Sequence, residues 1–123
     1  MESMFQDCGS FNHPLDGWQV DKVTNMQYMF QAAVSFNQPI GGWRVDKVTS
    51  MGAMFYAAWV FNQPLNDWQV NNVTDMFDMF YAAEAFNQTL GWCVDSGVDV
   101  TTMFTGTKCG PTCGVTFDCP GPP

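Results

Sequence analysis

The sequence has few basic residues, a single histidine and no long hydrophobic segment. Only four of its 123 residues are Lys or Arg, against twelve Asp or Glu, which gives a formal net charge of −8. Nucleic acids and anionic membranes are bound by basic surfaces, so this balance argues against both kinds of partner. No apolar run approaches the ~20 residues of a membrane span. We therefore expect no direct membrane insertion, and no signal peptide is visible.

Motifs for catalysis are also missing. The chain has no Ser-His-Asp set, no phosphate-binding loop and no HExxH zinc motif. Its one histidine, His13, stands in a column of glutamines and has no nucleophile placed beside it by any motif. We therefore predict that the protein is not an enzyme, with no catalytic residue and no cofactor.

A 25-residue repeat dominates what the sequence does contain. The spacing is 25 until Leu90, and one residue is then missing before Trp92. A fixed period of this size predicts a stacked solenoid, in which each unit buries its apolar face against its neighbours. The recurring pairs and single residues are Met4-Phe5, Met29-Phe30, Met54-Phe55, Met79-Phe80 and Met103-Phe104; Phe11-Asn12, Phe36-Asn37, Phe61-Asn62 and Phe86-Asn87; and Trp18, Trp43, Trp68 and Trp92.

The spacing within one unit predicts its local structure. Met29, Ala33 and Phe36 fall at i, i+4 and i+7, which predicts a short helix over 26–33 that ends before Pro39. Trp-x-Val and Val-Thr are rich in β-forming residues and predict a short parallel strand. The apolar columns are expected to form the core, with Phe stacked on Phe. The Asn column is expected to face inward and to bond backbone groups that the turns leave unpaired.

The full unit is Met-Phe-x-x-Ala-x-x-Phe-Asn-Gln-Pro-Leu-x-x-Trp-x-Val-x-x-Val-Thr-x-Met. Over residues 1–104 it resembles the repeat of the BspA-like leucine-rich-repeat surface proteins, found in bacterial surface lipoproteins and in secreted proteins of protists and algae. The resemblance implies an α/β solenoid: an irregular leucine-rich-repeat-like right-handed coil with one short parallel strand and one short helix per turn. It also implies a cell-surface or secreted setting and, for some members, adhesion. It carries no catalytic residues.

Five cysteines fall into two groups. Cys8 occupies the column of Ala33, Ala58 and Ala83, which predicts a free cysteine in the core. The other four lie at or after the last full repeat, where residues 105–123 become rich in Gly and Pro and are expected to cap the repeats of 1–104. Disulfides there would place the protein in an oxidising, extracellular compartment, while a four-thiolate zinc site is the alternative. The disulfide candidates, whose pairing the sequence leaves open, are Cys93, Cys109, Cys113 and Cys119.

Polar columns suggest where a partner could bind. Asn72 begins an exposed Asn-Val-Thr sequon and is the candidate for glycosylation. The column Asp21, Asp46, Asn71 and Asp95 is interpreted as turn residues, with a calcium ladder as the alternative. Leucine-rich repeats usually bind through variable positions beside the strand. Those positions, our candidate binding face, are Gln19, Arg44, Gln69, Asn25, Ser50 and Asp75.

Two functions are compatible with these features. The first is a non-enzymatic surface or secreted module for adhesion or for binding a protein or glycan partner. The alternative is a structural or accessory subunit that docks through its open N-terminal end, because the chain starts in mid-repeat and exposes Met1, Met4 and Phe5 there.

Overall fold

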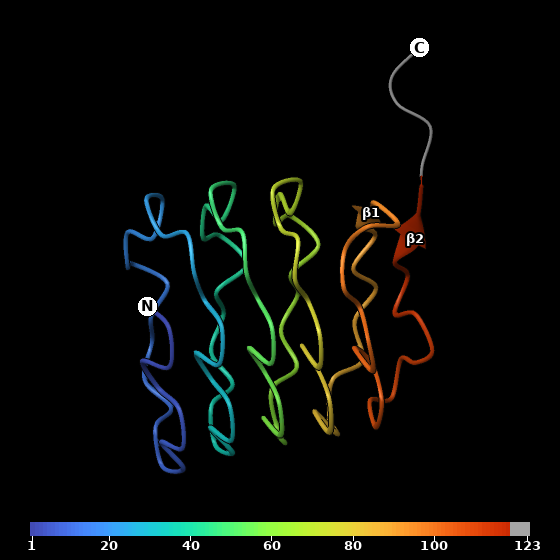
Figure 1. Ribbon diagram of the computed structural model, residues 1–123. Coiled ribbons are helices and arrows are strands. Elements are labelled where there is room, and N and C mark those ends of the chain that lie inside the picture. Colours follow the sequence, from blue (N-terminus) through green and yellow to red (C-terminus); the bar gives the residue numbers. More distant parts are fainter. Residues whose placement is uncertain (119–123) are drawn as a thin grey trace.

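The computed structural model describes residues 1–118, which wind into a coil whose turns lie side by side from the N-terminal to the C-terminal end (Figure 1). We call each turn a rung. The hydrogen bonds between neighbouring turns follow the sequence repeat, so the rungs are numbered by it. Rung one is 1–25, rung two 26–50, rung three 51–75, rung four 76–99 and rung five 100–118.

Backbone hydrogen bonds alternate in direction along the Met-Phe part of each rung. The Phe30 N–H donates to the Met54 carbonyl of the next rung at 2.9 Å. The Met29 N–H instead donates to the Met26 carbonyl of its own rung at 3.2 Å and closes a turn. This alternation satisfies one set of N–H groups within a rung and the other between rungs, as buried backbone groups require.

The prediction of a helix over 26–33 is wrong, because no helix occurs among residues 1–118. Tyr28 and Ala32 have φ angles of 60° and 57°, in the left-handed region that a right-handed helix excludes. A positive φ at the third residue of a four-residue turn is typical of a type II turn, as at Tyr28. The two left-handed columns are Ser3, Tyr28, Ala53, Asp78 and Thr102, and Asp7, Ala32, Ala57, Ala82 and Gly106.

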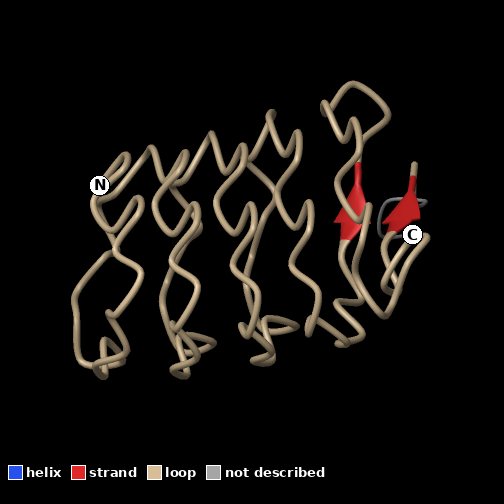
Figure 2. Cartoon of the chain, turned by 90° about the horizontal axis from the view of Figure 1, so that it is seen from below, coloured by secondary structure: helices blue, strands red, loops and turns tan. Residues whose placement is uncertain are grey.

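The prediction of a strand in every turn is also wrong. The described residues contain only β1 (Cys93–Val94) and β2 (Thr116–Phe117), which pair in parallel with Cys93 opposite Thr116. Both lie at the C-terminal end of the coil (Figure 2). Elsewhere the parallel pairing is reduced to single bridges between rungs. The chain is therefore not an α/β leucine-rich-repeat solenoid, since its rungs are built from turns and isolated bridges.

The core consists of the repeated apolar columns, and every buried side chain of the described residues is hydrophobic. Phe55 stacks between Phe30 and Phe80, with ring centroids 5.5 and 5.3 Å away. The predicted stacking of Phe on Phe is thus confirmed. Burying one such ring contributes on the order of 2–3 kcal/mol before entropy is counted. The indole N–H of Trp68 donates to the Ile40 carbonyl of the preceding rung at 3.0 Å, so this column adds a hydrogen bond to its packing.

The Asn column bonds the backbone of the neighbouring rung, as predicted. Asn37 Oδ1 accepts from the Asn62 N–H at 2.9 Å and from Gln63 Nε2 at 3.0 Å. The expectation that the whole column faces inward is wrong, because Asn12 and Asn87 at its two ends are exposed.

Residues after 104 continue the coil. The Ala82 N–H donates to the Thr105 carbonyl at 2.8 Å, and the Thr116 N–H donates to the Trp92 carbonyl at 2.9 Å. The segment that follows Lys108 packs beside Phe86, the last residue of its Phe column, and contains a disulfide in place of another ring. Rung five thus keeps the backbone path of the repeat after losing its sequence.

Two of the four disulfide candidates are bonded to each other, Cys109 to Cys113. This disulfide confirms the predicted staple and removes these two thiols from a zinc site. Cys93 is disulfide-bonded as well, and Cys119 lies outside the described residues. Cys8 is free as predicted, although it is half-buried and not fully in the core.

No helix among residues 1–118 is long and apolar enough to cross a membrane.

Candidate interaction face

One side of the coil carries a ladder of polar residues that bridge the rungs. Asn25 pairs with Ser50, Ser50 with Asp75, and Asp75 with Asp99, all in parallel. The structure thus brings three of the predicted binding residues, Asn25, Ser50 and Asp75, into one column and adds Asp99 to it.

Two side chains of this column accept hydrogen bonds from the backbone nearby. Asn25 Oδ1 accepts from the Gln27 N–H at 2.9 Å, and Asp75 Oδ1 accepts from the Phe77 N–H at 3.4 Å. These contacts are turns in which a side chain bonds the backbone two residues on. The Ser50 hydroxyl oxygen is buried and has no hydrogen-bond partner. The Asn25 Nδ2 donates to Glu2 Oε1 at 3.5 Å, and the second carboxylate oxygen of Asp75 remains for a partner.

Asp99 ends the column. Its carboxylate accepts from the Thr101 hydroxyl at 2.7 Å and from the Thr101 N–H at 3.0 Å. The hydroxyl bond, followed by the backbone bond, lowers the pKa of Asp99 below its ordinary value of 3.8. The group therefore keeps its negative charge on this face into acidic solution.

Aromatic rings lie beside the polar column. Tyr56 and Tyr81 stack across rungs three and four, with centroids 5.0 Å apart and planes 10° apart. Tyr28 meets Phe77 edge to face at 6.2 Å. Gly52 lies between them, and a Cβ there would come within 2.4 Å of the Phe77 ring. All four rings are half-buried, so each keeps part of its surface in solvent.

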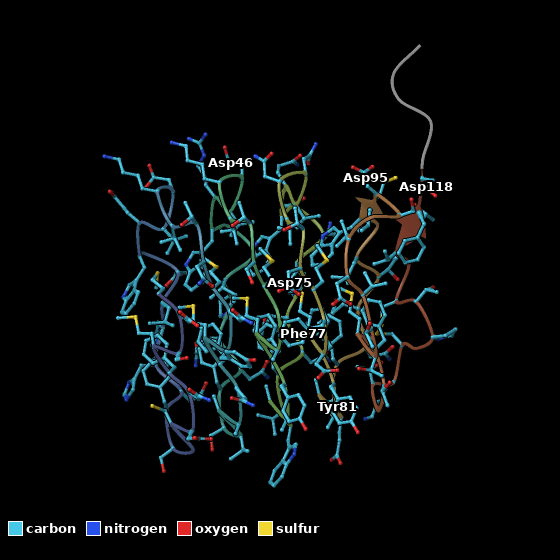
Figure 3. The ribbon with its side chains drawn as sticks, in the orientation of Figure 1. Asp46, Asp75, Phe77, Tyr81, Asp95 and Asp118 are labelled. Carbon is cyan, nitrogen blue, oxygen red and sulfur yellow. A yellow bond between two sulfur atoms is a disulfide. The ribbon has the colours of Figure 1, made fainter. Side chains whose placement is uncertain are left out.

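We call this surface the ladder face. Figure 3 shows Asp75, at the end of rung three, followed by Phe77 and Tyr81 in rung four. Half-exposed Tyr rings are typical of recognition surfaces, because a rigid ring offers contact area at low entropic cost and the hydroxyl adds a hydrogen bond. The ladder face is made of Asn25, Ser50, Asp75, Asp99, Tyr28, Phe77, Tyr56 and Tyr81.

The other three predicted binding residues, Gln19, Arg44 and Gln69, lie elsewhere. They are exposed along shallow grooves of about 310 Å³ between neighbouring Trp-x-Val segments. One of these grooves includes Asp46, which Figure 3 places at the upper edge of the coil, away from Asp75. The two halves of the predicted binding face therefore form two separate surfaces.

Asn72 is exposed, as its sequon requires, and glycosylation there stays a prediction. Its Nδ2 also donates to the Asp46 carbonyl at 2.7 Å, which fixes the turn between two rungs. The described residues contain no group of three or more His, Cys, Asp or Glu side chains arranged to hold a metal ion. Asp46 lies in a turn that the Val48 N–H closes by donating to the Val45 carbonyl at 3.0 Å, which agrees with the turn interpretation of its column.

The aromatic part of the ladder face is what sequence reasoning missed. Tyr56 and Tyr81 occupy a column that holds Gln6 and Gln31 in the first two rungs. A change from Gln to Tyr in an otherwise conserved unit was the available indication. The column falls within the predicted helix over 26–33 and its equivalents, and the predicted binding face lies beside the strand, so the sequence prediction does not include it.

A comparison with protein-family models matches residues 1–110 to the family described as Mycoplasma protein of unknown function, DUF285. Neither the curated proteins nor the solved structures contain a significant match to the chain.

Proposed function

We propose that this chain, which belongs to the family described as Mycoplasma protein of unknown function, DUF285, is a non-enzymatic cell-surface or secreted module that binds a protein or glycan partner through the ladder face. The observation that carries the proposal is the stacked, half-exposed pair Tyr56 and Tyr81, on the two rungs that end in Asp75 and Asp99. The core is fully occupied by apolar packing, so surface columns are where residues can vary without loss of stability.

Two further features support this proposal. The disulfide between Cys109 and Cys113 is suited to an oxidising compartment such as the cell exterior. The net charge of −8 favours a neutral or basic partner, because like charges repel at an interface. The resemblance to the BspA-like surface repeats agrees with both features and remains part of the proposal.

The repeat itself supplies a matched test. The double variant Tyr56→Gln and Tyr81→Gln places a glutamine at both positions. The first two rungs already have glutamine in this column, at Gln6 and Gln31. The coil should therefore keep its fold. Binding would be measured on a printed glycan array and on a panel of purified basic proteins, with thermal melting as the check on folding.

We expect the double variant to lose about tenfold or more in affinity for any ligand that the wild type binds, because two ring contacts are removed. The control Arg44→Gln copies Gln19 and Gln69 on the separate groove surface and should bind as the wild type does. The proposal is overturned if the double variant binds unchanged, or if Arg44→Gln alone abolishes binding.

A further inference from the structure

Rung three exposes two large apolar side chains, although it has a rung on either side. Trp59 is 51% exposed, and the adjacent Val60 is 44% exposed. Trp68, the other tryptophan of this rung, is 2% exposed, and its indole N–H donates to the Ile40 carbonyl. The exposure of Trp59 therefore arises from its place on the outer surface of the coil, in a rung that is covered on both sides.

The repeat indicates that the fold does not require this ring. The same column holds Gly9 in rung one, Val34 in rung two and Glu84 in rung four. A position that accepts a glycine, a valine and a carboxylate imposes little packing requirement of its own. Tryptophan is enriched at the centres of contact surfaces, so a large exposed ring at such a position is suited to binding.

An acidic residue occupies the same column on the next rung. The Ala85 N–H donates to the Trp59 carbonyl at 3.1 Å, so the backbones of rungs three and four meet at this point. Glu84 is exposed, and within residues 1–118 its carboxylate forms no hydrogen bond or ion pair, not even with Lys108 in rung five. The Trp59 indole N–H has no acceptor in the same part of the chain. An unpaired carboxylate and an exposed ring thus lie in one column on consecutive rungs.

Charge is distributed unevenly along the coil. Residues 51–99, which form rungs three and four, contain six acidic residues and no Lys or Arg, for a formal charge of −6. Residues 1–50 contain five acidic and three basic residues, for a formal charge of −2. The electrostatic field around Trp59 therefore favours a cationic ligand over an anionic one.

We propose that Trp59 and Glu84 bind an arginine side chain of a protein partner. The guanidinium plane stacks on the indole, whose face attracts cations, and its N–H groups donate to the Glu84 carboxylate. Arginine suits the site better than lysine, because its planar and weakly hydrated guanidinium makes both contacts at once. A neutral sugar ring gains nothing from the acidic charge of rungs three and four. The site lies outside the ladder face and does not rest on the function proposed for that face.

The test uses the 123-residue chain and three peptides, hexa-arginine, hexa-lysine and hexa-glutamate. Isothermal titration calorimetry measures their affinities. Nuclear magnetic resonance follows the indole N–H signal of Trp59, which is assigned by its absence from the spectrum of Trp59→Val. The wild type should bind hexa-arginine about threefold more tightly than hexa-lysine and should not bind hexa-glutamate. The Trp59 signal should shift as hexa-arginine is added.

Two variants each remove one part of the site. Trp59→Val introduces the residue that rung two has at Val34, so the fold should be kept, and thermal melting checks this. It should bind hexa-arginine about threefold to fivefold more weakly, the loss expected for a cation–π contact at an exposed site. Glu84→Gln should weaken binding about threefold, as expected for an exposed ion pair. Trp59→Phe retains an aromatic face and should lie between the wild type and Trp59→Val.

Asp95→Asn is the matched control for charge. It removes one carboxylate from the same rung as Glu84, but from another part of the surface. Figure 3 places Asp95 at the upper edge of the coil and Tyr81, three residues before Glu84, in its lower part. Asp95→Asn should therefore bind hexa-arginine as the wild type does.

The proposal is overturned if the wild type does not bind hexa-arginine, or if Trp59→Val binds it as tightly as the wild type. Equal weakening by Asp95→Asn and Glu84→Gln would indicate attraction to the net charge of the chain and would overturn the proposal as well. So would a Trp59 signal that shifts with the neutral sugar cellohexaose but not with hexa-arginine, because the ring would then be a sugar-binding surface.

Discussion

The inner rungs and the end rungs use the same columns but bury them to different extents. Phe30, Phe55 and Phe80 are fully buried between neighbouring rings, whereas Phe5 and Phe104 are half-buried because each has a rung on one side only. The difference shows that a residue of the repeat stabilises this fold through its neighbours in the stack. An identical residue at an end therefore contributes less.

The two ends also differ from each other. Rung one keeps the sequence of the repeat and leaves its rings partly exposed. Rung five abandons the sequence and replaces the second Phe with the disulfide between Cys109 and Cys113. A covalent link can hold an end in place where aromatic packing on one side is insufficient.

The sharpest test of this comparison is the same truncation in an inner and an end rung. Phe55→Ala should cost about 3 to 5 kcal/mol of unfolding free energy, because it leaves a cavity among three stacked rings. Phe5→Ala should cost only about 1 to 2 kcal/mol, because the ring is already half in solvent. Urea unfolding followed by Trp fluorescence measures both. Equal losses of unfolding free energy in the two variants would mean that it does not matter whether a ring lies in an inner or an end rung.

Removal of the disulfide tests how rung five is held. The double variant Cys109→Ser and Cys113→Ser should lose about 2 kcal/mol, the chain-entropy value for so short a loop. The loss should be local. Hydrogen exchange of the Leu90 N–H, which donates to the Cys113 carbonyl at 2.8 Å, should accelerate more than that of the Phe30 N–H. Cys8→Ser is the control and should change little, since Cys8 is free.

Exchanging Ala and Gly in one left-handed column tests whether inner and end rungs tolerate the same residue. Ala57→Gly in rung three should change stability by no more than about 0.5 kcal/mol. Glycine relieves the backbone strain at a φ of 56°, but it also raises the conformational entropy of the unfolded chain, and the two effects offset each other. Gly106→Ala should cost about 1 kcal/mol. Its φ is 86°, and a Cβ there would lie 3.2 Å from the Ala82 Cα. Thermal melting measures both variants. Equal shifts of the two melting temperatures would contradict this expectation.

The smallest effect concerns the pH dependence of the contact between Asp99 and Thr101 near the C-terminal end. Folding lowers the pKa of Asp99, so this contact stabilises the fold above the ordinary pKa of 3.8 and stops doing so as the pH falls through the lower folded value. Thr101→Val should therefore melt slightly below the wild type at neutral pH, and the difference should vanish in strong acid. Thr105→Val, whose hydroxyl makes no hydrogen bond, is the matched control. A difference that persists in acid would contradict this account.

The core could be predicted from the sequence, and the local backbone could not. The Phe, Met and Trp columns recur at a period that only stacking explains, and the structure buries them in the inner rungs. Met29, Ala33 and Phe36 also fit a helical face, and the prediction followed that fit. The inward direction of the same residues arises here from successive turns, whose left-handed positions at Tyr28 and Ala32 carry no glycine to indicate them.

The candidate site was likewise predictable in part from the sequence. The alignment of Asn25, Ser50 and Asp75 follows from the period, and the structure confirms it. Their separation from Gln19, Arg44 and Gln69 depends on the path of the backbone between the two columns. So does the exposure of Tyr56 and Tyr81, since the predicted helix would have placed them elsewhere.

By itself the sequence determined that successive units stack and which residues lie between them, because periodic apolar residues can be buried only against their own copies. Tertiary structure alone decided that the turns contain no helix, that β1 and β2 form only at the C-terminal end, and that rung five continues the coil without the repeat. The physical reason is that backbone hydrogen bonds between rungs do not depend on side-chain identity. They hold the path of the chain wherever a neighbouring rung supplies the partner groups.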